Sequence, residues 1–340
     1  MKIKHALLRT VAPALYALAA ALAPWHAARA QATPALPLTI YLSPTGSDNL
    51  NGSTPAAAVA TLQAALAHAE QALQDGASDV LIEVRDGTYV GQNMVTKGAG
   101  PGKRLSIARK ANTSARPVFD GGGSAATWLT VNSQSGQAAN LTIAGLKVKN
   151  YLSAVTLNGS RDDAKRSVNH VVIKNNIFDT IGQSTVVPGA PSFAAIRMVN
   201  GDDNLIANNL FTHIRNVQRC ALLHAVYMAH DSTGNTIQNN QFENGCGDAL
   251  RFRDESNHNL VKSNSFKDSW AYTPISDWYC DAEARDDCTK ESKECPSLDN
   301  VLEANTMLAE TLPNQGLSKV YGSDVKSWCP ASAGARFIVR

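Results

Sequence analysis

The second half of the chain repeats a short pattern of alternating apolar and polar positions that runs into Asn and ends in Phe. The pattern occurs at residues 171–178, 205–211, 236–242 and 260–266. Apolar residues two apart predict a strand with one buried face. A unit that recurs every few tens of residues is typical of a solenoid of stacked coils. We therefore expect function to reside on the stacked outer surface.

Each coil contains a second apolar strand after the one that carries Asn. These strands are expected at residues 154–158, 195–199, 225–229 and 249–253. Because side chains alternate along a strand, one set faces the interior and the other faces out. The inward set is Val155, Ile196, Val226 and Leu250 together with Leu157, Met198, Met228 and Phe252. The outward set is Thr156, Arg197, Tyr227 and Arg251.

One asparagine stays in register from coil to coil. Its positions are Asn176, Asn209, Asn240, Asn264 and Asn305. Asn suits bends, and neighbouring coils in a parallel sheet lie about 4.8 Å apart, within reach of side-chain amides. We expect a ladder of hydrogen-bonded amides that satisfies the turning backbone.

The N-terminal part of the mature chain has a different pattern. A strand is expected at residues 39–44, followed by a polar turn at 46–55. Apolar residues then recur with helical spacing at Ala58, Leu62, Ala65, Leu66, Ala69 and Leu73. Such a helix would cover the open end of the first coil. We assign residues 39–78 to this strand and capping helix, and 79–320 to the solenoid.

The motifs of these segments resemble those of a known group. The residues Tyr41-Leu42-Ser43-Pro44-Thr45-Gly46-Ser47-Asp48, followed by the Asn-Asn-x-Phe coils, resemble secreted right-handed parallel β-helix proteins of the pectate-lyase-like superfamily. The resemblance covers roughly residues 39–310 and implies an all-β, single-domain parallel β-helix. It does not define a reaction, because this architecture carries lyases, hydrolases, uronate epimerases and non-enzymatic surface proteins.

The first thirty residues have the features of a secretory signal peptide. Lys2, Lys4 and Arg9 precede an Ala-rich apolar stretch, and residues 28–30 offer a small-x-small cleavage site. We expect cleavage after Ala30, a linker at 31–38, and a periplasmic or secreted protein without a membrane span. Cleavage removes four basic and no acidic residues, so the formal charge changes from +2 to about −2. A mature chain without excess basic charge argues against nucleic acid as a partner.

All six cysteines lie in the mature chain, and an even number in an exported protein favours disulfides. Cys220 and Cys246 precede successive repeat strands and are expected to pair. Cys280, Cys288, Cys295 and Cys329 are expected to link a polar C-terminal region, with a loop insertion at about 270–298 and a tail at 321–340. Their spacing does not match a structural zinc site.

Candidate chemistry gathers on the outward strand face. Arg197, Tyr227 and Arg251 form one column, and Arg253 lies two residues beyond Arg251. Clustered guanidinium groups require acidic neighbours or an acidic ligand. An outward salt-bridge ladder is the alternative, and its carboxylates would come from Asp248, Asp254 and Glu255.

Two histidines flank the central tyrosine of that column. The coil alignment puts His224 next to Asp248, and His230 next to Asp254. A carboxylate beside a histidine fixes one tautomer and makes the ring more basic. The alternative is that both histidines cap turns and bond their neighbours.

These groups fit an acidic polysaccharide, with a lyase as the expected enzyme. Arginine would neutralise the uronate carboxylate while Tyr or His moves a proton. The expected catalytic residues are Tyr227, Arg251, His230 and Arg197, with His224, Asp248, Arg253 and Asp254 binding substrate. No cofactor is specified, although oxygen ligands leave calcium open. The chain is expected to be a monomer.

Three alternatives remain open from the sequence. An epimerase would use the same groups. A hydrolase would need two carboxylates, for which Asp202 and Asp203 are the further candidates, although they are better explained as turn residues. A non-catalytic module would bind glycan through aromatic residues. Those aromatics, which we expect instead to pack the disulfide-rich segment, are Trp270, Tyr272, Trp278 and Tyr279.

Overall fold

The computed structural model describes residues 36–133, 135–182, 194–216, 220–267, 273–280, 288, 293–308, 316–321, 327–329 and 334–340. The expected signal peptide and most of the expected linker lie outside these residues. Within the described residues, no helix is both long and apolar enough to cross a membrane. Residues 36–340 form one compact unit.

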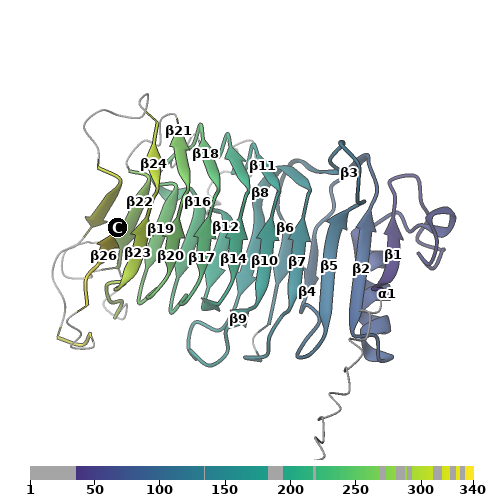
Figure 1. Ribbon diagram of the computed structural model, residues 1–340, viewed down its shortest axis with the longest axis horizontal. Coiled ribbons are helices and arrows are strands. Elements are labelled where there is room, and N and C mark those ends of the chain that lie inside the picture. The colour runs from purple at the N-terminus through teal and green to yellow at the C-terminus, as the bar shows by residue number, and fades with distance from the viewer. Residues whose placement is uncertain are drawn as a thin grey trace, which may run out of the picture. The chain divides into compact units, whose positions relative to one another are not determined.

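The first sheet of the stack, here the A sheet, is entirely parallel (Figure 1). Each strand pairs in register with the corresponding strand of the next coil, as Ile173 does with Ile143 and Ile206. In the described residues its strands are β1 (Leu38–Leu42), β2 (Asp79–Val84), β5 (Arg104–Arg109), β7 (Leu141–Ala144), β10 (Val171–Lys174), β14 (Leu205–Ala207), β17 (Thr236–Gln238), β20 (Leu260–Lys262), β23 (Asn300–Glu303) and β26 (Phe337–Val339).

The second sheet has two rows of strands, which the long strands β6 (Val118–Val131) and β8 (Lys147–Asn158) join. The B1 row also contains β3 (Thr88–Val90), β11 (Ile177–Asp179), β15 (Leu210–Thr212), β18 (Gln241–Glu243), β21 (Ser265–Lys267) and β24 (Thr306–Met307). The B2 row also contains β4 (Met94–Thr96), β12 (Ala194–Val199), β16 (His224–Ala229), β19 (Leu250–Arg253), β22 (Ile275–Trp278) and β25 (Ser318–Tyr321). A short pair, β9 (Val168–Asn169) with β13 (Gly201–Asp202), joins two turns. The chain therefore coils through three faces, as a parallel β-helix does.

The predicted inward residues fill the interior. All eight are completely buried, and an aromatic stack lies beside them. Phe211 stacks on Phe178 and Phe242 with ring centroids 5.0 and 4.9 Å apart, close to the spacing of the coils. The expected core face of the B2 strands is confirmed.

The predicted asparagine ladder is present at the bend between the A sheet and the B1 row. Asn209 Oδ1 accepts hydrogen bonds from Asn176 N at 2.9 Å and Asn176 Nδ2 at 3.2 Å, and Asn209 repeats the arrangement with Asn240. The residue before each ladder position adopts a left-handed conformation, with φ of 56° at Asn208 and 54° at Asn239. This conformation explains the Asn-Asn pairs, because Asn tolerates positive φ.

A second buried asparagine ladder, which was not predicted, lies at the bend that leads into the A-sheet strands. It consists of Asn204, Asn235, Asn259 and Asn300. Each residue precedes a member of the first ladder by five positions, a spacing visible in the sequence.

The N-terminal end of the stack is covered by helix α1 (Leu62–Gln74), as predicted (Figure 1). Thr61 caps it by accepting a hydrogen bond from Ala64 N at 3.2 Å. Its apolar face joins the main core through Leu62, Ala65, Leu66, Ala69 and Leu73. Two 3₁₀ turns, Pro55–Ala57 and Cys220–Leu222, complete the helical elements of the described residues.

The C-terminal region is linked by disulfides and continues the repeat. Cys220 pairs with Cys246, as predicted, and the other bonds are Cys280–Cys288 and Cys295–Cys329. Within the expected loop insertion, residues 275–278 form β22 and pair with β19. Within the expected tail, residues 337–339 form β26 and pair with β23. These short stretches add strands to the stack, whereas much of the rest of the expected insertion and tail lies outside the described residues.

Candidate functional site

The outward column predicted from the sequence is present on the B2 row. Arg197, Tyr227 and Arg251 occupy directly paired positions on β12, β16 and β19. Arg253 is the next outward residue along β19 and pairs with Trp278 of β22. The alignment of coils is therefore confirmed.

Tyr227 points away from the coil interior but is only 5% exposed. It packs with Ala194 and Ala229 in an apolar cluster separate from the main core. Its ring stacks on that of His224 with 5.5 Å between centroids. Arg253 lies against its hydroxyl and donates to it from Nη1 at 2.9 Å. The outward position predicts an open surface, and these contacts explain why this residue is covered instead.

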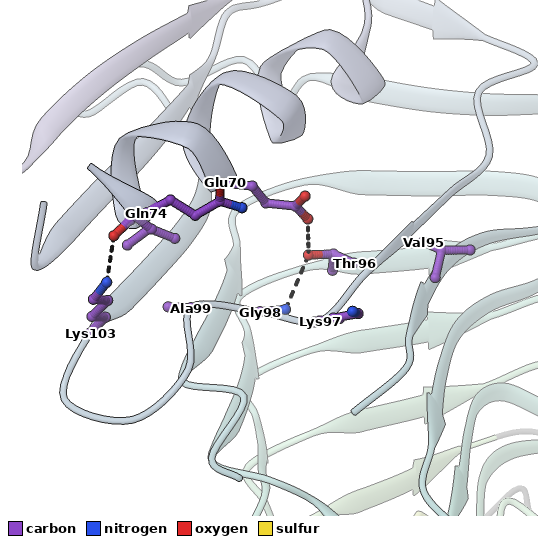
Figure 2. A pocket seen from close by; sticks show the side chains of 9 residues that line it. Glu70, Gln74, Val95, Thr96, Lys97, Gly98, Ala99 and Lys103 are labelled. Atoms are coloured by element: carbon purple, nitrogen blue, oxygen red, sulfur yellow. Dashed lines mark hydrogen bonds between the residues drawn. The ribbon is translucent and has the colours of Figure 1, made fainter. Parts of the chain in front are cut away.

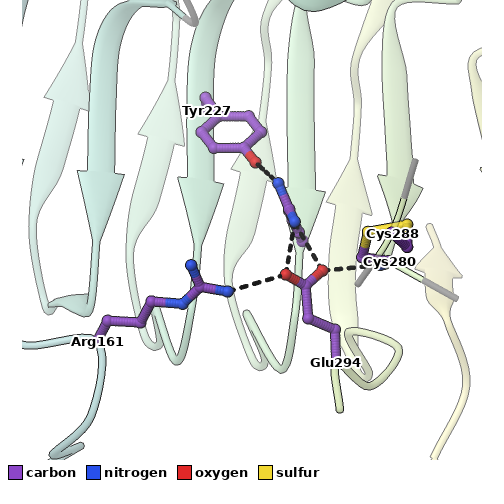
Figure 3. Close-up of a disulfide and its surroundings, with 6 residues drawn as sticks. Arg161, Tyr227, Cys280, Cys288 and Glu294 are labelled. Atoms are coloured by element: carbon purple, nitrogen blue, oxygen red, sulfur yellow. Dashed lines mark hydrogen bonds and ion pairs between the residues drawn. A yellow bond between two sulfur atoms is a disulfide. The ribbon is translucent and has the colours of Figure 1, made fainter. Parts of the chain in front are cut away.

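The carboxylate of Glu294 accepts hydrogen bonds from three parts of the chain (Figure 3). Arg253 donates to it twice, from Nε to Oε2 at 2.7 Å and from Nη2 to Oε1 at 2.5 Å. Arg161 Nη2 lies 3.2 Å from Oε1, and the backbone N–H of Cys280 donates to Oε2 at 2.7 Å. Burial alone would lower the pKa of Arg253, but its hydrogen bonds to Glu294 raise it. Glu294 thus neutralises part of the arginine cluster.

Asp248 anchors the other arginine of β19. Arg251 donates from Nη2 to Asp248 Oδ2 and from Nε to Ser276 Oγ at 2.5 Å. Ser276 in turn donates to the same carboxylate oxygen at 2.8 Å, and Thr273 N donates to Oδ1 at 3.1 Å. At Asp248 the structure thus matches the alternative interpretation, in which carboxylates pair with the arginines.

His224 does not contact the carboxylate of Asp248, contrary to the sequence-based expectation. Its Nδ1 lies 2.8 Å from the backbone carbonyl oxygen of Asp248. A carbonyl only accepts, so Nδ1 carries the proton and Nε2 has the lone pair. Complete burial, with the charge of Arg251 nearby, lowers the pKa of His224 well below its usual value. The ring is held in one tautomer as expected, but it is made less basic rather than more.

His230 and Asp254 form the expected pair in the turn that follows the B2 strands. The distance from His230 Nδ1 to Asp254 Oδ2 is 2.7 Å. Both residues adopt left-handed conformations, with φ of 53° and 51°. Asp254 is itself oriented by the backbone N–H of Cys295, which donates to Oδ1 at 3.1 Å. Asp254 therefore contacts a histidine, not one of the arginines.

A hollow of about 320 Å³ adjoins this pair. It is lined by His230, Arg197, Arg161, Asp162 and Val199, together with residues 158–160. Burial, together with the charges of Arg253 and Arg161, lowers the pKa of Arg197. An arginine remains charged in proteins even so. The hollow thus brings cationic groups and an oriented imidazole to one surface.

Three residues of the site could surround a cation. Oxygen or nitrogen atoms of His230, Asp254 and Glu294 lie within 4.8 Å of one another. However, both oxygens of Glu294 already accept hydrogen bonds from Arg253, and a guanidinium so close to a metal ion would repel it. The donor set therefore fits an ion pair better than a metal, and the possible need for calcium stays a prediction.

Another hollow, of about 380 Å³, lies beneath α1 (Figure 2). Its charged residues hold the cap in place. Glu70 accepts a hydrogen bond from Thr96 Oγ1 at 3.3 Å, and Lys103 Nζ donates to the carbonyl of Leu73 in the last turn of α1. Although this hollow is larger than the one beside Arg197, its contacts are structural.

The remaining sequence candidates have structural positions. Asp202 ends the short strand β13 and accepts a hydrogen bond from Thr233 N at 3.0 Å, and Asp203 lies in the turn after it, with φ of 51°. Trp278 lies under Arg253, with 4.5 Å from Cζ to the ring centroid, and Tyr279 is buried. Trp270 and Tyr272 lie outside the described residues.

Glu294, Arg161 and Ser276 were missed by the sequence analysis. Ser276 had a detectable signal, because it follows Arg251 in the outward column once β22 is recognised as a coil. Glu294 and Arg161 lie in irregular segments, where no periodicity indicates which way a side chain points.

Residues 129–273 match a family model described as "Right handed beta helix region". With the sheet topology, this match confirms the predicted right-handed parallel β-helix and, for the fold, the resemblance to pectate-lyase-like proteins. No curated protein sequence matches the chain.

Solved structures with a similar fold have diverse functions. An alginate lyase from Paenibacillus sp. str. FPU-7 is 15% identical, with a TM-score of 0.48, over 71% of this chain and 74% of the lyase. The catalytic domain of a GH87 α-1,3-glucanase is 14% identical, with a TM-score of 0.48, over 73% of this chain and 43% of that one. PfbA, a surface adhesin of Streptococcus pneumoniae, is 14% identical, with a TM-score of 0.38, over 76% of this chain and 72% of the adhesin. These are similarities of fold, and function must be argued from the site.

Proposed function

We propose that this right-handed parallel β-helix protein is an exported enzyme that cleaves an acidic, uronate-containing polysaccharide by β-elimination. The observation that carries the proposal is that Arg197 and the His230–Asp254 pair meet at one hollow. Three disulfides are typical of proteins outside the reducing cytosol, which supports export.

Arg197 is suited to bind the uronate carboxylate. Removing the proton from the carbon next to that carboxylate produces an enolate-like anion, and a fixed cation stabilises this charge. Arg161 lines the same hollow, and Glu294, 3.2 Å from its Nη2, offsets part of its charge. The carboxylates of Glu294 and Asp248 already accept hydrogen bonds from Arg253 and Arg251, which reduces their repulsion of an incoming uronate carboxylate.

His230 is suited to remove the proton. With Nδ1–H bonded to Asp254, its Nε2 lone pair is free to act as a base. The C–H electron pair enters the enolate and then forms the new carbon–carbon double bond as the glycosidic oxygen departs. Asp254 stabilises the imidazolium that results.

Tyr227 is suited to protonate the departing oxygen. It is the strand neighbour of Arg197, and its hydroxyl oxygen accepts a hydrogen bond from Arg253, so the O–H proton is not used in that bond. Arg251 extends the column of arginines toward the next sugar. Asp248 holds Arg251 by an ion pair, and His224 in turn bonds the backbone carbonyl of Asp248. The same groups would serve an epimerase if the proton returned from the other face of the sugar.

The test is the ultraviolet absorbance of unsaturated uronates when residues 31–340 are incubated with a panel of acidic polysaccharides, with and without calcium. We expect absorbance to rise, and His230→Asn and Arg197→Gln to slow the rise by about 10²–10⁴-fold. The matched control is His213→Asn, which breaks another histidine–aspartate contact, 3.1 Å to Asp179 on the B1 row.

The other outcomes identify other functions. Changed sugar stereochemistry without absorbance would indicate an epimerase, and new reducing ends without absorbance a hydrolase. Binding without chemical change would indicate a non-catalytic module. Any of these results would overturn the lyase proposal.

A further inference from the structure

A second cationic hollow lies away from the candidate site, where the chain leaves the A sheet. It measures about 400 Å³ and is formed by the ends of β5, β7 and β10 and the turns that follow them. Its polar lining consists of Arg109, Arg116 and Asn175, with Gly145 between them. The hollow beside Arg197 instead adjoins residues 158–162, which precede the A-sheet strand β10. The two hollows share no lining residue, and no A-sheet strand lines the hollow beside Arg197.

Gly145 provides the space in which Arg109 lies. Its φ is 76°, and a Cβ there would come within 2.7 Å of Arg109 Cγ and 2.8 Å of Cδ. The stem of Arg109 thus packs flat against bare backbone. This packing limits the freedom of the side chain and reduces the entropy that binding would cost.

Arg116 is held in place by a hydrogen bond to the backbone. Its Nη1 donates to the carbonyl of Asn175. Burial and the neighbouring charge of Arg109 lower the pKa of Arg116, which reflects two like charges close together.

Neither arginine has a carboxylate within ion-pair distance among the described residues, and no acidic residue lines the hollow. Three other half-buried arginines, Arg251, Arg253 and Arg336, each pair with a carboxylate. Two guanidinium groups held together without an acid form a preorganised site for an anion with two oxygens.

We propose that the Arg109–Arg116 hollow binds a carboxylate of an acidic glycan, as an anchoring site separate from the site of cleavage. The choice of glycan rests on the proposed function; the choice of an anion rests on the two arginines alone. Lys110 and Lys174 are exposed directly after β5 and at the end of β10 and extend the positive surface around the hollow.

The test compares the affinity of full-length mature variants for a polyuronate, a sulfated polysaccharide and a neutral polysaccharide by affinity electrophoresis. All variants carry Arg197→Gln, which weakens the other cationic hollow. We expect Arg109→Gln and Arg116→Gln each to weaken polyuronate binding at least about tenfold, the effect of losing a hydrogen bond to a charged group. Arg104→Gln is the matched control, because Arg104 is exposed and pairs with Asp79 at 2.6 Å.

Gly145→Ala is a second variant that keeps both charges but displaces Arg109. It should weaken binding as well, provided that its melting temperature shows a folded protein. Unchanged binding in both arginine variants would overturn the proposal, as would equal binding of the neutral polysaccharide. Preferential binding of the sulfated polymer would overturn the choice of carboxylate. If the arginine variants lose binding but the parent protein, with Arg197 intact, cleaves no polysaccharide, the anchoring site stands and the lyase proposal fails.

Discussion

Arg253 and Glu294 are joined by two parallel hydrogen bonds, and the remaining guanidinium nitrogen of Arg253 donates to Tyr227. Glu294 comes from the disulfide-linked segment, whereas Arg253 and Tyr227 come from regular strands. The position of the candidate catalytic tyrosine therefore depends on an irregular segment that follows it in the chain.

Replacing Glu294 with Gln should destabilise the protein. Glu294 is 2% and Arg253 19% exposed, so the change leaves a largely buried guanidinium without its counter-charge. We expect a loss of about 3 kcal/mol in the free energy of unfolding, measured by urea denaturation. Glu303→Gln, which breaks an exposed pair with Lys262, should leave the urea midpoint unchanged. Equal midpoints for the two variants would contradict the argument.

Removing the Cys295–Cys329 disulfide should impair the site more than the fold. The backbone N–H of Cys295 orients Asp254, and Glu294 precedes it in the chain. We expect Cys295→Ser/Cys329→Ser to slow cleavage while the far-ultraviolet circular dichroism spectrum stays that of the parent. If the effect acts partly through Glu294, the loss in the Glu294→Gln background should be smaller than in the wild type. A full additive loss would show that the disulfide acts elsewhere.

The sequence alone predicts the strands and register of the repeating coils. It does not predict the contacts made by the irregular segments that pack against them. Period-two apolar residues and the register of Asn209 and Asn240 identify the coils, because stacking forces equivalent positions to coincide. The same alignment brought Tyr227 beside Arg251 and His230 beside Asp254. Each part of this prediction follows from the spacing of residues within a repeat and from the alignment of one repeat with the next.

The errors arose where a side chain turns toward an irregular segment or the backbone. His224 lies next to Asp248 as expected, but its ring bonds the carbonyl rather than the carboxylate. Periodicity locates residues without specifying which atoms meet. The partner of Arg253 was missed because Glu294 lies in a segment without a repeat, and only tertiary structure brings the two together.

The asparagine ladder should be essential for stability. In Asn240→Ala, the backbone N–H of Asn209 loses its acceptor in the buried interior, as does Asn209 Nδ2. Each unsatisfied buried group costs about 1–3 kcal/mol, so the urea midpoint should fall markedly. Asn239→Gly is the matched control one residue earlier, because glycine adopts the left-handed conformation of Asn239 freely. A milder effect at Asn240 than at Asn239 would contradict the role of the ladder.

Stability should fall in mild acid because of His224. The pKa of His224 is lowered in the folded state, so below the unfolded pKa of about 6.5 the unfolded chain binds a proton that the native state does not. The free energy of unfolding should therefore decrease as pH falls below about 6.5, by up to about 1.4 kcal/mol per pH unit from this group. His224→Gln should flatten this slope relative to the wild type, whereas His170→Gln, at an exposed position, should not. Identical slopes would mean that His224 protonates equally in both states.

Tyr227→Phe should separate chemistry from packing. Phenylalanine keeps the ring that stacks on His224 and packs with Ala194 and Ala229, but it removes the hydroxyl that accepts from Arg253. We expect a modest fall in the melting temperature, because Arg253 Nη1 loses this acceptor, and a fall of about 10²–10⁴-fold in the rate of unsaturated-uronate formation. Tyr41→Phe, in β1 near α1, serves as the control for removing a tyrosine hydroxyl away from the site. A fall in substrate affinity at an unchanged maximal rate would mean that the hydroxyl only positions Arg253, and the proton for the departing oxygen would then have to come from another group.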